Sequence, residues 1–316
     1  MQRILVIRGG AIGDFVLTLP AIKLLRDAFP QSHLEILGYK HIIALAENRF
    51  YADATRSIEY APLARFFAKG SDLAPELIAY FGSFDLIVSY LFDPDAIFEN
   101  NVRRCGVEIF VACSPLVDAS DHAAAQLASP LGQLGLALRS TAAQLYPSAE
   151  DREAAKSFLG ETGLPLIALH PGSGSARKNW PVANWQQLSA QLLESRVGAS
   201  LLFIGGEADE QALSAMRGQF RDTARFADFL PLPLLSAVLE RCDHFVGHDS
   251  GISHIAAAVG TPCMLLFGAT NPNVWAPANR NVQVLKASTG ELAGVSPAWV
   301  YEAIRASSSL STKPTS

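Results

Sequence analysis

Each half of this chain opens with a short apolar run that leads directly into a glycine-rich turn. Residues 4–7 precede Gly9-Gly10-Ala11-Ile12-Gly13, and residues 164–169 precede His170-Pro171-Gly172-Ser173-Gly174. Helical segments and further short apolar runs then alternate, which is typical of parallel βαβ units. The sequence therefore predicts an α/β protein with two Rossmann-like, doubly wound parallel sheets. Domains of this kind that face one another would form a central cleft along the carboxyl ends of their strands, where ligands bind.

The remaining elements follow from the same alternation. Strands are expected at 34–37, 86–90, 200–204, 244–246 and 264–267, and helices at 15–29, 42–48, 184–193, 209–220 and 232–241. Pro20 should kink the first helix or restart it, and residues 114–147 are expected to be helical. The stretch 148–163, which is charged and expected to be helical, is the expected linker and gives domains at 1–150 and 151–306. The Ser/Thr-rich tail, 307–316, is predicted to be disordered.

Size and charge narrow the class of protein. The 316 residues suffice for two cores, and 49% hydrophobic with 17% charged residues is typical of a globular chain. A net charge of −5 argues against a nucleic-acid partner. No apolar run reaches the roughly 18 residues of a membrane span, and no signal peptide is expected. Four cysteines without paired close spacing suggest buried thiols in a reducing cytoplasm.

The segment Gly247-His248-Asp249-Ser250-Gly251-Ile252-Ser253-His254 lies between an apolar run and an alanine-rich helical stretch. The first turn of such a helix has unpaired backbone N–H groups, and the helix dipole favours an anion there. Ser250 and Gly251 would let a phosphate approach closely, and His254 could reach the same ligand. We expect a diphosphate site; the alternative is an Asp/Ser helix cap with nothing bound.

The first glycine turn does not match a dinucleotide-binding motif. Its spacing is not G-x-G-x-x-G, and Asp14 would repel a pyrophosphate at the helix start. A carboxylate at a helix N-terminus is stabilised as an anion, so Asp14 is a candidate proton acceptor. The alternative is that Asp14 only caps the helix.

Two further turns contain groups that could bind the phosphates or the ribose of a nucleotide. In the loop 170–181, the backbone at Ser173 and Gly174 could contact phosphate oxygens and Lys178 supplies a cation; the alternative is a solvated loop anchored by Trp180. In the turn after residue 204, Glu207 could bind ribose hydroxyls, although capping by Asp209 explains these acids equally well.

The segment Asp93-Pro94-Asp95 has the D-x-D spacing of one class of metal-dependent glycosyltransferases. Two acids around a proline are also common in loops, and this second interpretation is favoured. No metal site is therefore predicted.

Four motifs occur in order along the chain: Ile4-Leu5-Val6-Ile7-Arg8…Ile12-Gly13-Asp14, His170-Pro171-Gly172-Ser173…Lys178-Asn179-Trp180-Pro181, Asp249-Ser250-Gly251…His254-Ile255-Ala256-Ala257-Ala258 and Phe267-Gly268-Ala269-Thr270-Asn271-Pro272…Trp275-Ala276-Pro277. Together they resemble glycosyltransferase family 9, the bacterial lipopolysaccharide heptosyltransferases, and the resemblance runs nearly end to end. It implies a GT-B fold, with the acceptor held by the N-terminal domain and the donor by the C-terminal domain.

The same resemblance implies an inverting, metal-independent transfer of a sugar, typically heptose, from an ADP-sugar to a lipopolysaccharide-core-like acceptor. The enzyme would need no cofactor. It would be cytoplasmic, and a lipid-linked acceptor would bring it into peripheral contact with the inner face of the cytoplasmic membrane. Residues 92–115 do not resemble the acceptor domain of the core heptosyltransferases, so another glycan or a lipid-linked sugar is an alternative acceptor.

The resemblance also implies residue roles. Asp14 would be the general base, and Asp249 would order its turn or meet a donor hydroxyl. Glu207 would be a base or a ribose contact. The groups that would stabilise the departing diphosphate are Ser173, Gly174, Lys178, Ser250 and Gly251.

Two alternatives to a transferase are a nucleotide-sugar epimerase or hydrolase of the same fold and a non-catalytic protein that binds a nucleotide sugar. The joint presence of Asp14, Lys178 and His254 argues against a degenerate binding protein.

Overall fold

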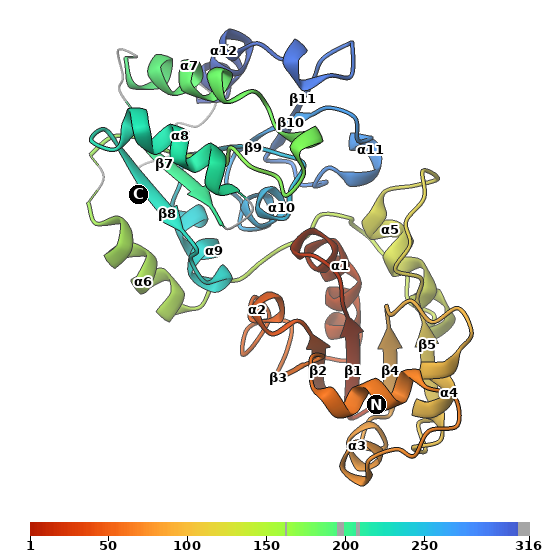
Figure 1. The fold of residues 1–316 in the computed structure, drawn as a ribbon. Helices are drawn as coiled ribbons and strands as arrows, with labels where there is room; N and C mark the ends of the chain where they lie inside the picture. Colours follow the sequence, from red (N-terminus) through yellow and green to blue (C-terminus); the bar gives the residue numbers. More distant parts are fainter. Residues whose placement is uncertain (162, 195–198, 207–208, 309–316) are drawn as a thin grey trace. The chain divides into compact units, whose positions relative to one another are not determined.

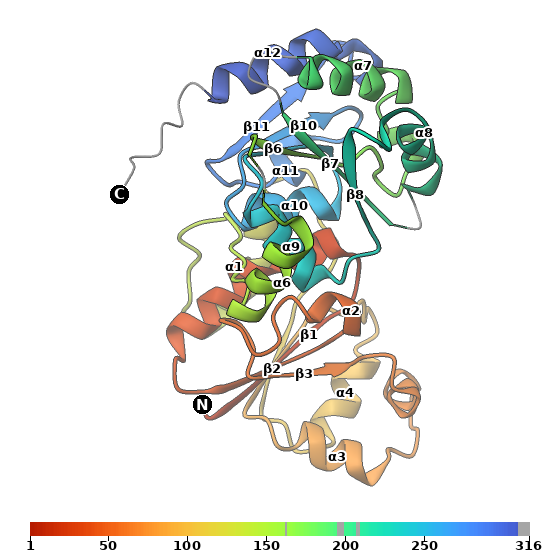
Figure 2. The same cartoon turned by 90° about the vertical axis from the view of Figure 1, so that its left-hand side faces the viewer.

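The computed structural model describes residues 1–161, 163–194, 199–206 and 209–308. The chain divides into two compact units, unit 1 (Met1–Tyr146) and unit 2 (Pro147–Ser316). Each unit is a parallel sheet with helices packed against it (Figures 1 and 2). The prediction of two doubly wound parallel sheets is therefore confirmed. Within the described ranges, no helix is both long and apolar enough to cross a membrane.

Unit 1 contains five parallel strands in the order β3-β2-β1-β4-β5. Their bounds are Arg3–Arg8 (β1), His33–Gly38 (β2), Ala54–Ser57 (β3), Leu86–Ser89 (β4) and Ile109–Ala112 (β5). The α-helices are Ile12–Ala28 (α1), Lys40–Ile43 (α2), Pro75–Phe81 (α3), Ile97–Arg103 (α4) and Ala123–Ala128 (α5), and the 3₁₀ helices are Ala61–Phe67 (η1) and Ser129–Leu134 (η2).

The central strand β1 explains the first apolar run. Leu5 and Ile7 belong to a core that also contains side chains of η1, α3 and α4. Because side chains alternate along a strand, Ile4 and Val6 point to the opposite face, and these two residues are fully buried as well. Both faces of the sheet are covered, so a continuous apolar run is required here rather than an alternating one.

The described part of unit 2 contains six parallel strands in the order β11-β10-β9-β6-β7-β8. They are Leu166–Leu169 (β6), Ser200–Gly205 (β7), Ala224–Asp228 (β8), His244–His248 (β9), Cys263–Phe267 (β10) and Val282–Lys286 (β11). The helices are Ala149–Leu159 (α6), Val182–Leu193 (α7), Glu210–Phe220 (α8), Leu232–Glu240 (α9), Gly251–Ala258 (α10), Pro272–Trp275 (α11), Pro297–Ser308 (α12), and the 3₁₀ turns Ala176–Lys178 (η3) and Leu292–Gly294 (η5).

Several predicted elements of unit 1 need correction. The helix α1 runs through Pro20 without a restart, because proline removes only one N–H group and the surrounding turns remain bonded. The helix predicted at 42–48 is only α2, and Asn48 adopts a positive φ of 52°. Residues 114–147 are helical only in α5 and η2, since the rest of this stretch is irregular.

Two corrections concern unit 2. The expected linker, 148–163, contains a helix as predicted, but this helix, α6, belongs to unit 2 and packs beside α9. Arg152 forms an ion pair with Glu240 of α9. Ser148 caps α6 by accepting a hydrogen bond from the Asp151 N–H. In the tail predicted to be disordered, Ser307 and Ser308 are helical, because α12 continues to Ser308. Residues 309–316 lie outside the described residues.

The strand order places both glycine-rich turns at equivalent positions. In unit 1 the order reverses between β1 and β4, and in unit 2 it reverses between β6 and β9. Open α/β sheets bind ligands outside the carboxyl ends of the strands at such a switch point. The turn with Asp14 follows β1, the loop with Lys178 follows β6, and the Asp249 turn follows β9. These three segments therefore lie at the two switch points.

Candidate functional site

Asp14 lies in the first turn of α1, next to the glycine turn that follows β1. Its Oδ2 accepts a hydrogen bond from the Ala11 N–H (2.9 Å), and its Oδ1 lies 3.7 Å from a guanidinium nitrogen of Arg8. Gly10 has a φ of +94°, which residues with a Cβ avoid. The Asp14 side chain is 38% exposed, against 3% for Arg8. Asp14 therefore caps the helix, as the alternative interpretation held, and also remains accessible to a ligand.

Arg8 is a buried cation to which the sequence analysis assigned no role. Its Nε donates to Thr18 Oγ1 (3.0 Å), and a terminal nitrogen donates to the backbone oxygen of Asp14 (3.3 Å). Its guanidinium also lies 5.7 Å from the centroid of the Tyr90 ring. Burial lowers the pKa of Arg8, and the charge of Asp14 opposes that effect. The signal in the sequence was a basic residue at the end of an otherwise apolar, buried strand.

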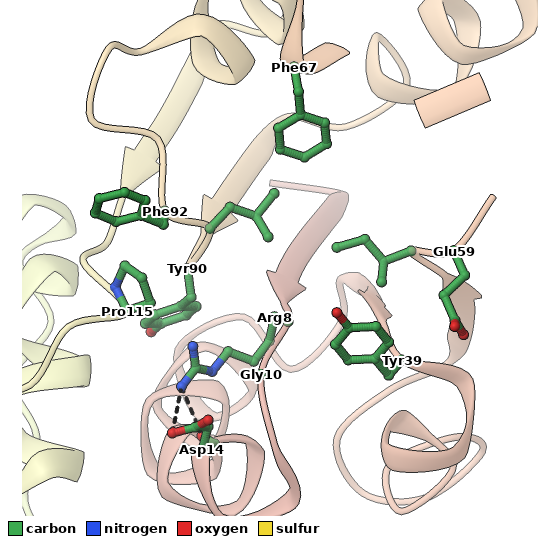
Figure 3. Close-up of a pocket in the computed structure, with 12 residues that line it drawn as sticks. Arg8, Gly10, Asp14, Tyr39, Glu59, Phe67, Tyr90, Phe92 and Pro115 are labelled. Carbon is green, nitrogen blue, oxygen red and sulfur yellow. Dashed lines mark hydrogen bonds and ion pairs between the residues drawn. The ribbon is translucent and has the colours of Figure 1, made fainter. Parts of the chain in front are cut away.

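A cavity of about 550 Å³ opens at this switch point of unit 1. Figure 3 shows Arg8 and Asp14 together on one side of the space, Phe67 across from them, and Tyr39 and Tyr90 flanking Arg8. The volume and the mixture of aromatic walls with few polar groups are common for small-molecule sites. Asp14 therefore faces a cavity that can hold a ligand.

His248, the last residue of β9, holds the loop that follows β6. The Trp180 N–H donates to its Nε2 (2.8 Å), and its Nδ1 lies 3.2 Å from the backbone oxygen of Gly172. These partners require a neutral ring protonated on Nδ1. Burial lowers the pKa of His248 to about 4, which agrees with that form. Sequence analysis assigned no role to His248, because its partners lie 68 and 76 residues away.

Lys178 and Asp249, two predicted donor-binding residues, are brought together by the fold. Lys178 Nζ donates to Asp249 Oδ2 at 2.6 Å, and the two side chains are 36% and 10% exposed. Ser173 donates to Asn179 Oδ1 (2.5 Å) in the same loop, and Gly174 is exposed with a φ of +68°. The loop therefore places a partly exposed ammonium group directly before the start of α10.

Ser250 is the N-cap of α10, and its Oγ accepts a hydrogen bond from the Ser253 N–H (3.3 Å). The same Oγ lies 3.3 Å from His170 Nδ1, and His170 Nε2 lies 3.3 Å from Asp209 Oδ2. Because a carboxylate can only accept, the His170 ring donates from Nε2 to Asp209, and its Nδ1 faces the Ser250 hydroxyl. A buried chain of three side chains thus fixes the hydroxyl at the helix start.

Of the two acids considered in the turn after β7, the structure describes Asp209. Asp209 precedes α8 but makes no cap hydrogen bond there; its carboxylate instead accepts from the Gly206 N–H (3.0 Å) and contacts His170. The proposal that Asp209 caps the helix is therefore wrong. Burial raises the pKa of Asp209, but the hydrogen bond and charge of His170 outweigh it, so the net shift is downward. Glu207 lies outside the described residues.

The remaining residues of the predicted diphosphate site lie on α10. Gly251 is the first residue of this helix, and its small size leaves the first turn accessible. His254 lies one turn later and is buried, with 5% of its surface exposed. Contact between His254 and a ligand stays a prediction.

The described residues contain no group of three His, Cys, Asp or Glu side chains that could hold a metal ion. Asp93 has a structural role instead, because its two carboxylate oxygens accept from the N–H groups of Phe98 and Glu99 at the start of α4 (3.1 and 2.9 Å). This geometry supports the loop interpretation of the Asp93-Pro94-Asp95 segment.

Comparison with known proteins points to one family. The model of glycosyltransferase family 9 (heptosyltransferase) matches residues 113–298, more than half of the chain. Lipopolysaccharide heptosyltransferase 2 of Salmonella typhimurium is 28% identical over 158 residues, which cover 46% of this chain and 44% of that protein. The similarity to this relative therefore spans less than half of its length.

Solved structures extend the similarity over both units. A glycosyl transferase of family 9 from Veillonella parvula has a TM-score of 0.81 at 22% identity, and 98% of each chain is covered. The Escherichia coli heptosyltransferase WaaC with ADP-2-deoxy-2-fluoro heptose has a TM-score of 0.71 at 17% identity, covering 97% of this chain and 100% of that chain. These likenesses confirm the predicted fold class, which is the GT-B architecture.

Proposed function

The chain belongs to glycosyltransferase family 9, and we propose that it transfers heptose from ADP-heptose to a hydroxyl group of a glycan acceptor. Unit 2 would bind the donor, and unit 1 would bind the acceptor. The donor is proposed by analogy with WaaC, whose structure contains an ADP-heptose analogue. A lipopolysaccharide-core-like acceptor is proposed by analogy with relatives named for lipopolysaccharide.

The observation that carries this proposal is the position of Lys178 at the start of α10. Its ammonium group is bonded to Asp249, which immediately precedes the N-cap Ser250. The N–H groups of a helix start and an adjacent cation together form a site for a diphosphate. Asp249 would hold Lys178 in place through this contact, whereas the sequence favoured ordering of its own turn or contact with a donor hydroxyl. The same groups would stabilise the charge that develops on departing ADP, so a metal ion would not be needed for this task.

Asp14 would act as the general base. Its carboxylate would take the proton of the acceptor hydroxyl while that oxygen bonds to the anomeric carbon of heptose. The bond between this carbon and the diphosphate oxygen breaks, and ADP leaves with the electron pair. Attack from the face opposite ADP inverts the anomeric centre. The exposed position of Asp14 in a cavity supports this role, because a base must reach the proton it abstracts.

A cytoplasmic location, with peripheral contact to the inner membrane, belongs to the same proposal. Support comes from Leu116, which is 68% exposed and follows Pro115 at the cavity of unit 1. An exposed leucine next to the acceptor site would suit an acceptor that is linked to a lipid.

The test compares Asp14→Asn with wild type in an assay of ADP release. Asparagine keeps an oxygen for the Ala11 N–H but cannot take a proton, so we expect transfer to fall about 10²- to 10⁴-fold. ADP affinity, measured by calorimetry, should not change. Lys178→Ala, in contrast, should weaken ADP binding and should also slow turnover.

The matched control is Asp27→Asn, because Asp27 lies on the same helix, where it accepts hydrogen bonds from Lys23 at the surface. This variant should transfer normally. Normal transfer by Asp14→Asn would reject the base assignment. Consumption of ADP-heptose by wild type without any acceptor would indicate the alternatives, an epimerase or a hydrolase.

A further inference from the structure

The cavity of unit 1, which is proposed to bind part of the acceptor glycan, is lined by few charged side chains. Unit 1 is described without gaps, and among the residues that line this cavity only Arg8, Asp14 and Glu59 carry a charge. Two of these three are acids. The cation is 3% exposed and lies 3.7 Å from the Asp14 carboxylate, so most of its charge is balanced within the protein.

Part of the hydrogen-bonding capacity of Arg8 is used within the protein. Its Nε bonds Thr18, and a terminal nitrogen bonds the backbone oxygen of Asp14 and faces the Asp14 carboxylate. An anionic group on the acceptor would compete with Asp14 for this guanidinium. It would also be repelled by Asp14 and Glu59, because like charges within a few ångströms are unfavourable.

The rest of the wall consists largely of aromatic and aliphatic groups. Three aromatic side chains in it remain well exposed: Tyr39 (37%), Phe67 (44%) and Phe92 (64%). Figure 3 shows them on different sides of the cavity, with the Glu59 carboxylate next to Tyr39. Three exposed rings around one cavity form an apolar wall, and the faces of such rings attract C–H groups with partial positive charge.

We infer that the acceptor group bound beside Asp14 is an uncharged sugar ring rather than a sugar acid or a phosphorylated sugar. Its C–H faces pack on Phe92 and the neighbouring rings, and its hydroxyl groups donate to Glu59. This inference rests on the proposed function, since it concerns the acceptor in the same cavity.

The probes are methyl heptopyranoside, which is uncharged, its 4-phosphate, and the methyl glycoside of a sugar acid. Binding to the full-length protein with ADP present is measured by saturation-transfer NMR. We expect the uncharged glycoside to bind best, and Phe92→Ala to weaken it about tenfold. Glu59→Lys should shift the preference toward the 4-phosphate. Trp299→Ala, which removes an exposed ring of α12 in unit 2, is the matched control and should have no effect.

Stronger binding of either anionic probe to wild type would overturn the inference, as would absence of binding by the uncharged glycoside while ADP binds. In both cases a normal ADP affinity would leave the proposed donor site intact. Conversely, loss of ADP binding together with Phe92-dependent binding of the uncharged glycoside would reject the donor assignment and retain the inference.

Discussion

At the scale of single residues, the site of unit 2 depends on two histidines, His170 and His248, to which the sequence motifs assign no role. His248 bonds backbone groups at Gly172 and Trp180, two points of the loop that contains Lys178. His170 connects Asp209 to Ser250 in the same region. These contacts are buried, so they fix the loop rather than meet the ligand. The chemistry expected of Lys178 and Ser250 thus requires neighbours that never touch the substrate.

The stability of unit 2 should depend on pH through the titration of His248. Its pKa is about 4 in the folded protein against 6.5 ordinarily. Between about pH 6.5 and pH 4, the unfolded chain binds a proton at this residue and the folded chain does not. The free energy of unfolding therefore decreases as the pH falls from about 6.5 toward 4. The loss from this residue is about 3 kcal/mol. His248→Gln can keep both hydrogen bonds without titrating, so its stability should fall less.

The measurement is urea unfolding at about pH 7.5 and about pH 5, monitored by tryptophan fluorescence. His244 also has a pKa lowered by burial, so the difference between wild type and His248→Gln isolates the contribution of His248. Equal losses in the two proteins would show that His248 is already charged in the folded state.

At the scale of elements, the loop after β6 packs so closely on the turn before α8 that one glycine is required. A Cβ on Gly172 would overlap the Asp209 side chain, which cannot easily move because it is bonded to His170 and Gly206. The small residues of this loop therefore serve packing as well as the approach of a phosphate.

We expect Gly172→Ala to displace the loop and to weaken ADP binding at least tenfold, because Lys178 and the backbone at Ser173 would shift. Gly206→Ala is the matched control, since a Cβ there meets no atom of the described residues within 4 Å and φ is not positive. Calorimetry with ADP measures both variants. Wild-type affinity in Gly172→Ala would show that the loop geometry is unimportant for the diphosphate.

At the scale of the whole molecule, the two units can be followed separately by their aromatic residues. All four tryptophans, at positions 180, 185, 275 and 299, lie in unit 2, whereas six of the seven tyrosines lie in unit 1. Tryptophan fluorescence therefore reports the unfolding of the unit proposed to bind the donor.

ADP should raise the free energy of the unfolding transition that tryptophan fluorescence reports. At about 100 times its Kd, a ligand adds about 2.7 kcal/mol to the free energy of unfolding of the unit that binds it. UDP, GDP, CDP and NAD serve as comparisons at equal concentration. Selective stabilisation by ADP is the expected result; a preference for UDP or GDP would change the proposed donor, and a response to NAD alone would contradict a glycosyltransferase.

The sequence by itself was enough to predict the α/β class, most strands and the positions of the glycine-rich turns. These features are local: a fully apolar run such as 4–7 marks a strand covered on both faces, and Asp14 follows a turn that lies at a strand end in any such fold. The motifs also identified the family, because residues around Lys178 and Asp249 recur in a set order.

Only the tertiary structure decided which of these residues act together. Lys178 meets Asp249 across 71 positions, and His170 meets Ser250 across 80, because the strand order of unit 2 places β6 beside β9. Local patterns contain no information on such neighbours, and for that reason the role of Asp209 was left open between alternatives. The balance of charge around Arg8 likewise depends on packing, since burial and distance determine how strongly the guanidinium interacts with a ligand.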